Sequence, residues 1–256
     1  MHEFIDTHCH LSDRAFAGEE EEVIRRAAEA GVTRMIQADV DSTERDAMFA
    51  LTDKHPGTLF PMLGLYPGSV DADWRDEIDR MLPYRERGIV AVGEIGLDYH
   101  YSKDTAELQK EAFRTQLELA SEWDLPVNIH LREATEDFFK VIEDCRHLHL
   151  RGNLHAFSGS AEVFERLSRN GEWYVGIGGV VTFKKASIAE DVKRIPLERI
   201  LLETDSPSLT PVPHRGERNE SSMIPVIAAF LAERLGVPVE TVADITTNNA
   251  RQLFGI

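Results

Sequence analysis

The stretch Phe4-Ile5-Asp6-Thr7-His8-Cys9-His10 decides between the two folds that the pattern of this chain allows. Residues 4–7 are typical of a buried strand, and a His-x-His pair follows directly. Successive side chains of a strand point to opposite faces, so His8 and His10 fall on one side. Two imidazoles there can hold one divalent cation, while Cys9 points the opposite way, into the core. A doubly wound open sheet would instead carry a Gly-rich phosphate loop after its first strand.

Short apolar segments alternate with amphipathic ones along the rest of the chain, and they are rich in Val, Ile and Leu, as buried parallel strands are. The expected strands are 4–7, 34–38, 59–65, 89–93, 127–130, 152–157, 173–178 and 200–203. The expected helices are 19–30, 42–54, 73–87, 104–123, 134–145, 161–170, 187–194, 220–235 and 238–253. This alternation predicts an α/β fold, a (β/α)8 TIM barrel with its site at the C-terminal face of the strands. With no linker, repeat or low-complexity tract, residues 1–256 are expected to form a single domain.

Composition places the chain among ordinary globular proteins, with 42% hydrophobic and 29% charged residues. No apolar run approaches the roughly 20 residues of a membrane span, and no signal-peptide pattern is present at the start. The two cysteines give no disulfide framework. These features predict a cytoplasmic protein with no membrane contact, and none of them implies a protein partner.

The formal net charge of −17 repels nucleic acid over long range. No basic stripe or arginine-rich arm offsets it, and runs such as Glu19-Glu20-Glu21-Glu22 are typical of solvated helix faces. A nucleic-acid substrate would therefore have to be held locally, by metal ions and a few basic residues.

Metal-ligating side chains recur where the expected strands end, which is where barrel enzymes build their sites. The candidate ligands are His8, His10, Glu94, His130, His155 and Asp205. One catalytic zinc takes about three protein ligands, so six ligands suit two divalent ions bridged by a carboxylate. Glu94 is the expected bridge, because its strand lies between the first strand and the fifth and sixth. Histidine-rich ligation favours zinc or manganese, and the carboxylates also accept magnesium.

Basic residues near the same face are candidates for substrate binding. Arg215 lies in the loop after the eighth strand, Lys184 follows the seventh, and Arg132 stands two residues after His130. Arginine offers a bidentate fork to a phosphate, although an internal salt bridge would explain Arg215 equally well. His100 is a weaker candidate for the pocket wall.

Two further histidines, His147 and His149, lie between the fifth helix and the sixth strand. They are expected at the opposite face, as surface residues.

With these residues in place, the chain resembles the TatD family of metal-dependent hydrolases, a branch of the amidohydrolase superfamily. The motifs that carry the resemblance are Ile5-Asp6-Thr7-His8-Cys9-His10, Gly93-Glu94-Ile95-Gly96-Leu97-Asp98-Tyr99, Ile129-His130-Leu131-Arg132, His155-Ala156-Phe157-Ser158-Gly159, Glu203-Thr204-Asp205-Ser206-Pro207 and Arg215-Gly216-Glu217-Arg218-Asn219. The resemblance implies a distorted (β/α)8 barrel and a divalent-metal-dependent deoxyribonuclease, often with 3′-to-5′ exonuclease character. It also implies metal binding by the same six side chains.

The chain departs from the family pattern at three positions. Tyr66 stands where many members have a histidine thought to face the substrate, Ser221 where a proline is usual, and Ala156 where a cysteine is usual. The changes at Ser221 and Ala156 are expected to be structurally minor.

The expected reaction is phosphodiester hydrolysis by a metal-activated water, with Asp205 as general base and Glu94 as bridge. Arg215 or Lys184 would neutralise charge on the phosphate. Two alternatives stay open. The same cluster suits hydrolysis of an amide, a lactone or an aminoacyl-tRNA ester, and a barrel of this kind could also serve as a non-catalytic binding protein.

Overall fold

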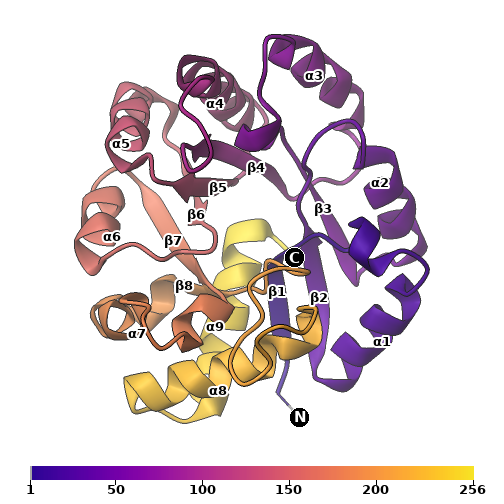
Figure 1. Ribbon diagram of the computed structural model, residues 1–256, viewed down its shortest axis with the longest axis vertical. Helices are drawn as coiled ribbons and strands as arrows, with labels where there is room; N and C mark the ends of the chain where they lie inside the picture. Colours follow the sequence, from indigo (N-terminus) through magenta and orange to yellow (C-terminus); the bar gives the residue numbers. More distant parts are fainter. Residues whose placement is uncertain (1) are drawn as a thin grey trace.

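The computed structural model describes residues 2–256 and shows a ring of parallel strands surrounded by helices (Figure 1). The strands are β1 (Phe4–Cys9), β2 (Val32–Gln37), β3 (Leu59–Leu63), β4 (Ala91–Asp98), β5 (Val127–Arg132), β6 (Arg151–Leu154), β7 (Glu172–Ile177) and β8 (Ile200–Leu202). The helices are α1 (Glu20–Glu29), α2 (Arg45–Lys54), α3 (Trp74–Met81), α4 (Ala106–Glu122), α5 (Thr135–Asp144), α6 (Ala161–Ser168), α7 (Ile188–Asp191), α8 (Ile224–Leu235) and α9 (Val239–Phe254). Neighbouring strands pair in chain order from β1 to β8, which confirms the (β/α)8 barrel.

Burial explains why these segments form this fold. Every residue of β1 and of β4 is buried, as expected for strands with the barrel interior on one side and helices on the other. Helices α4 and α5 place Phe113 and Phe138 on the outside of the sheet, where their rings stack with centroids 6.1 Å apart. The alternation of apolar and amphipathic segments in the sequence therefore corresponds to the inner layer of strands and the outer layer of helices.

The barrel closes between β1 and the segment that follows β8. The Asp205 N–H donates to the His8 carbonyl and the His10 N–H to the Ser206 carbonyl, both at 2.9 Å. Below this junction, the buried Asp6 carboxylate accepts hydrogen bonds from the hydroxyls of Thr204 (2.6 Å) and Ser221 (2.7 Å). The seam is thus built by the same two segments that carry three of the candidate ligands.

Some elements differ in length from the expected ones. Strand β4 runs to Asp98 and β5 to Arg132, so Glu94 lies within a strand rather than after one, and His130 lies inside its strand rather than at the end. The helix expected over 73–87 ends at Met81 and continues as a single 3-10 turn, because Pro83 cannot donate the backbone hydrogen bond that an α-helix needs. The helix expected over 187–194 likewise ends at Asp191, before a 3-10 turn.

Among residues 2–256, no single helix has both the length and the apolarity to cross a membrane. One sharply bent pair, Ser221–Leu235 with Val239–Phe254, meets those criteria only when its two helices are combined.

Candidate metal centre

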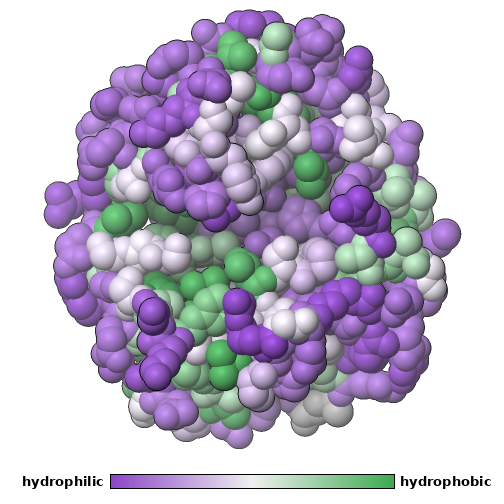
Figure 2. Space-filling view, in the orientation of Figure 1, coloured by the Kyte–Doolittle hydropathy of each residue, from purple (hydrophilic) through white to green (hydrophobic). Residues whose placement is uncertain are grey.

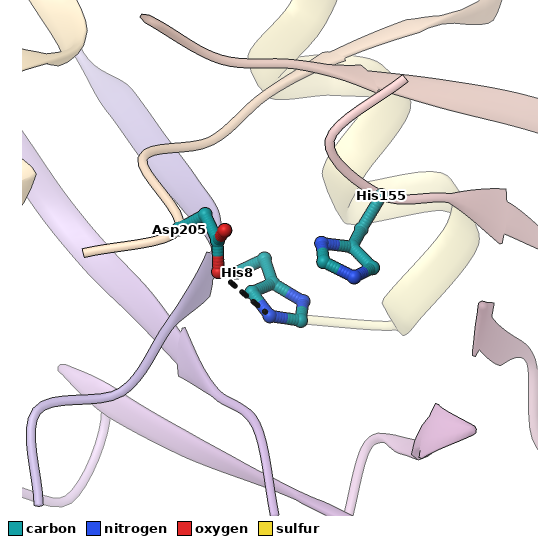
Figure 3. Close-up of side chains that lie close together, drawn as sticks. All are labelled: His8, His155 and Asp205. Atoms are coloured by element: carbon teal, nitrogen blue, oxygen red, sulfur yellow. Dashed lines mark ion pairs between the residues drawn. The ribbon is translucent and has the colours of Figure 1, made fainter. Parts of the chain in front are cut away.

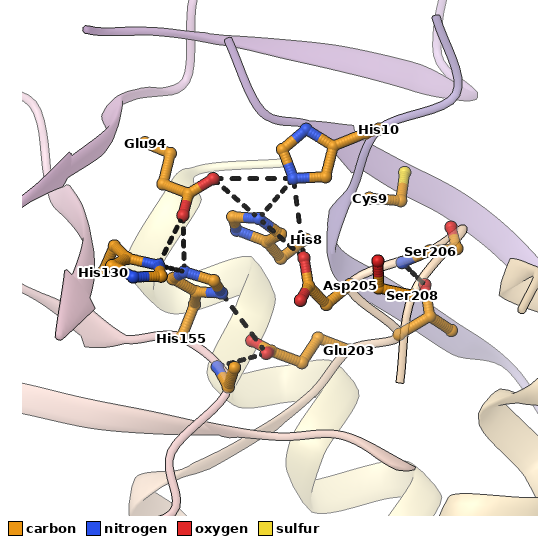
Figure 4. Close-up of polar contacts among 12 residues, drawn as sticks. His8, Cys9, His10, Glu94, His130, His155, Glu203, Asp205, Ser206 and Ser208 are labelled. Atoms are coloured by element: carbon orange, nitrogen blue, oxygen red, sulfur yellow. Dashed lines mark hydrogen bonds and ion pairs between the residues drawn. The ribbon is translucent and has the colours of Figure 1, made fainter. Parts of the chain in front are cut away.

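The six side chains singled out from the sequence meet at the C-terminal end of the barrel (Figure 4). His8 comes from β1, Glu94 from β4 and His130 from β5, while His10, His155 and Asp205 follow the ends of β1, β6 and β8. His8, Glu94 and His155 are buried. Parallel strands bring their carboxyl ends to one edge, which is why residues up to 197 positions apart in the chain converge here.

Glu94 divides this cluster into two sets of ligands. Its Oε2 faces the β1 side, 3.4 Å from His8 Nε2 and 3.5 Å from His10 Nε2. Asp205 Oδ1 completes this set at 3.6 and 3.5 Å from the same two nitrogens. Figure 3 shows Asp205 turned toward His8, with the His155 ring stacked against His8 at 3.9 Å between centroids.

The other oxygen of Glu94 faces the second set. Oε1 lies 2.8 Å from both His130 Nδ1 and His155 Nε2, and these two nitrogens are 3.1 Å apart. One carboxylate therefore presents a separate oxygen to each of two groups of imidazoles, which is the geometry of a bridging ligand.

The spacing of these atoms fits divalent cations. Bonds of about 2.0–2.1 Å in tetrahedral geometry place neighbouring ligand atoms about 3.3–3.4 Å apart. The two Nε2 atoms of His8 and His10 are 3.1 Å apart, and the nitrogen–oxygen distances of their set run from 3.4 to 3.6 Å. Lone pairs of imidazoles and carboxylates that converge on one point repel each other unless a cation lies between them. The spacing of the His8 and His10 set therefore suits one ion, whereas the atoms of the His130 and His155 set lie at hydrogen-bond distances of 2.8–3.1 Å.

Charge within the cluster keeps its carboxylates ionised. Burial raises the pKa of Glu94, but the imidazoles of His155 and His130 outweigh it and hold that pKa well below the usual range. Burial likewise opposes ionisation of Asp205, and His10 and His155 lower its pKa below the usual value. Burial lowers the pKa of His155, whereas Glu94 and Glu203 raise it well above normal. The carboxylates and imidazoles of the cluster thus stabilise one another in their charged forms.

A cavity of about 550 Å³ opens above the cluster, and Figure 2 shows it as a hollow near the centre of the face. Five of the six candidate ligands line it: His10, Glu94, His130, His155 and Asp205. The other lining residues with polar or charged side chains are Asp13, Glu44, Tyr66, Arg132, Ser158 and Ser208. The cavity is large enough for a small ligand or for the end of a polymer.

A family model described as TatD related DNase matches residues 5–255. The chain belongs to this family. A metal-dependent hydrolase of Bacillus subtilis, YabD, is 39% identical over 256 residues, which cover 98% of both chains. The 3′-5′ ssDNA/RNA exonuclease TatD of Pantoea ananatis is 34% identical over 98% of this chain and 99% of its own length.

A solved TatD homologue supports the same assignment. The crystal structure of YJJV from Escherichia coli K12 superposes with a TM-score of 0.90 at 32% identity, over 99% of this chain and 98% of that one. This TatD-family protein is accordingly a metal-dependent hydrolase, with a histidine and carboxylate cluster that can bind metal.

The basic residues expected at the substrate site are not brought together. Arg132 lines the cavity. Arg215 lies over the Phe183 ring, 4.0 Å from its centroid, and Lys184 is exposed; within residues 2–256, neither belongs to the cavity wall.

The two histidines expected as surface residues, His147 and His149, are both exposed.

His100, the remaining candidate for the pocket wall, is not among the described residues that line the cavity. It forms an ion pair with Glu133 at 2.6 Å instead. Tyr66, by contrast, does line the cavity, where its hydroxyl donates to Asp98 Oδ2 at 3.3 Å. Burial, together with the nearby carboxylates of Glu94 and Asp98, raises the pKa of this phenol, so it remains a hydrogen-bond donor.

Three supporting residues were missed in the sequence. Asn128 Oδ1 accepts from His8 Nδ1 and Asp98 Oδ2 from His130 Nε2, both at 2.9 Å, while Glu203 Oε1 lies 3.8 Å from His155 Nδ1. The hydrogen bonds from His8 to Asn128 and from His130 to Asp98 orient these two imidazoles so that the other nitrogen faces the cluster, and Glu203 lies beside His155. The available signal was a separation of two or four residues from a candidate ligand, which places two side chains on the same face of an extended chain. Asn128 stands two residues before His130, Asp98 four after Glu94, and Glu203 two before Asp205.

Proposed function

We propose that this protein is a divalent-metal-dependent deoxyribonuclease that removes nucleotides from the 3′ end of single-stranded DNA. The observation that carries the proposal is the division of Glu94 between two ligand sets beneath an open cavity. Paired divalent ions are a recurrent device of phosphodiester hydrolysis. Membership of a family described as DNases, and a relative named as a 3′-5′ ssDNA/RNA exonuclease, support the choice of substrate.

The proposed ligands are divided by the position of Glu94. His8, His10 and Asp205 hold one ion of zinc, manganese or magnesium, His130 and His155 hold the other, and Glu94 touches both. When bound, the ions acidify a water and neutralise charge on the phosphate. Asp205 faces the cluster with Oδ1 and also lines the cavity, so it is placed to accept the proton of the attacking water.

Arg132 is the proposed contact for the substrate phosphate. It is the one arginine or lysine among the lining residues of the part of the chain described, and its guanidinium can pair with two phosphate oxygens. Arg215 and Lys184 remain candidates for contacts with nucleotides outside the cavity.

A second candidate function follows from the acidic side of the cavity. Asp13 and Glu44 line it, and carboxylates there would attract an amine more readily than a phosphate. An aminoacyl ester, such as the linkage of an aminoacyl-tRNA, carries such an amine beside a bond that the same cluster can hydrolyse.

The test is release of nucleotides from single-stranded DNA labelled at its 3′ end, with a 5′-labelled strand in parallel. Protein reconstituted with manganese or zinc should shorten the strand from the 3′ end, and chelation should stop the reaction. Asp205→Ala should be inactive, whereas the matched control His147→Ala, changed at an exposed histidine, should equal the wild type. Metal-loaded wild type that leaves DNA intact but cleaves an aminoacyl ester would favour the second candidate.

A further inference from the structure

Tyr101 is unusual among the apolar side chains of this protein because it lies almost entirely in solvent. Its relative exposure is 86%, against 40% for Leu82 and 45% for Val212, the other large exposed apolar residues among 2–256. It stands in the loop after β4, at the face of the barrel that carries the cluster. A ring so exposed contributes little to the core.

The ring of Tyr101 is tied to the cavity through Arg132. The Arg132 guanidinium lies over it, 5.6 Å from the centroid, and Arg132 itself lines the cavity two residues after His130. His100 packs edge-on against the same ring at 4.7 Å between centroids. The aromatic face and the cationic group thus form one continuous surface that leads from the cluster to the outside.

The distribution of charge around the cavity favours this route for a polyanion. Asp13 and Glu44 come from the segments after β1 and β2, whereas Arg132 ends β5, four strands around the eight-stranded ring from β1. A strand of nucleic acid leaving the cluster would be repelled on the first side and attracted on the second.

We propose that Tyr101 is a stacking platform for a base of a single-stranded substrate, and that Arg132 binds the phosphate between that base and the cluster. Stacking on an aromatic ring beside a cationic group is the common way to bind single strands without reading their sequence, because every base has a flat π-face. The inference rests on the proposed nuclease function and adds a substrate-binding residue to it. Such a platform suits the single strand already proposed as substrate, since bases within a duplex are already stacked.

The test compares Tyr101→Ala with Tyr101→Trp, and with Leu82→Ala as a control that removes another exposed apolar side chain. KM for a single-stranded oligodeoxynucleotide should rise about tenfold in Tyr101→Ala, as expected for the loss of one stacked base, with little change in kcat. Tyr101→Trp should keep the wild-type KM, and Leu82→Ala should not change it. Hydrolysis of an abasic deoxyribose phosphate oligomer, which has no ring to stack, should be the same in all four proteins.

Binding measured without cleavage separates this inference from the proposed function. In an Asp205→Asn background, anisotropy of a fluorescent single strand should show the same tenfold loss for Tyr101→Ala, and a strand with abasic sites near its 3′ end should abolish the difference. Equal affinities for Tyr101→Ala and its parent would overturn the stacking role, even if the wild type cleaves DNA. Loss of hydrolysis of the abasic oligomer in Tyr101→Ala would also overturn it, because the ring would then act by holding Arg132 in place.

Discussion

At the scale of single residues, two imidazoles of the cluster, those of His8 and His130, are oriented by a hydrogen-bond partner behind them. His8 Nδ1 donates to Asn128 Oδ1, so its Nε2 is left with a lone pair directed at Glu94 and Asp205. Asn128 is itself fixed, because its amide nitrogen donates to Asn153 Oδ1 at 3.2 Å. His130 repeats the arrangement with Asp98. Such partners fix the tautomer that binds metal.

Substitution Asn128→Ala should therefore weaken metal binding by about 10- to 100-fold, the range seen when partners of ligand histidines are removed. The fold should persist, since the side chain removed is small and its neighbours on β5 keep their packing. Competition against a chromophoric chelator measures the affinity for metal. The control is Asn170→Ala, because Asn170 accepts a hydrogen bond from Arg146 at the surface, away from the cluster. Unchanged affinity in Asn128→Ala would show that His8 needs no such partner.

At the scale of elements, β7 supports the site although it supplies no ligand. A Cβ atom at Gly176 would lie 1.8 Å from Glu203 Oε2, so this glycine leaves the space that the buried Glu203 side chain fills. Glu203 in turn accepts from the Ala156 N–H and lies beside His155. A glycine in β7 thus positions a carboxylate from the segment after β8 against a ligand that follows β6.

Substitution Gly176→Ala should displace Glu203 and disturb the His130 and His155 ligand set. We expect a loss of about 1–3 kcal/mol in unfolding free energy from overpacking, together with a lower metal content. Gly178→Ala is a matched control in the same glycine-rich segment. The nearest atom to a Cβ at Gly178 would be the Glu203 carbonyl oxygen at 3.4 Å, which is an ordinary contact, so this substitution should be tolerated. Urea unfolding and elemental analysis give the two readouts. Equal behaviour of the two variants would refute the role given to Gly176.

At the scale of the whole molecule, the barrel is closed by polar contacts as well as by strand pairing. Asp6 of β1 accepts from Thr204 and from Ser221, which precedes α8. Ser221 is one of the departures from the family pattern and was expected to be minor. In this chain it adds a hydrogen bond across the seam, on a carboxylate two residues from His8.

Substitution Ser221→Ala should lower the unfolding free energy by about 1–2 kcal/mol, because it removes a donor from a buried carboxylate. Ser222→Ala changes the neighbouring, partly buried serine, for which no side-chain hydrogen bond is found in the described part of the chain, and should be close to neutral. Chemical denaturation of metal-free protein isolates this effect from metal binding. A Ser221→Ala protein as stable as Ser222→Ala would mean that the seam does not depend on this bond.

The sequence by itself determined the barrel and named the six candidate ligands that the fold brings together. Alternation of strands and helices reflects burial on two sides of a parallel sheet, and His8 with His10 follows from the two-residue period of a strand; both are local properties that the order of residues records. Strand ends were less well defined, because the pairing of β4 with β5 extends both strands beyond their apolar cores.

Only the tertiary structure decided how the candidate ligands divide into two sets, which imidazole nitrogen each presents, and which basic side chain lines the cavity. These depend on distances between side chains far apart in the chain, such as Glu94 to His155 and Arg132 to Tyr101. The sequence names residues of suitable chemistry, including Arg215 and Lys184, but the reach of a side chain into a cavity depends on loop paths that no local pattern encodes.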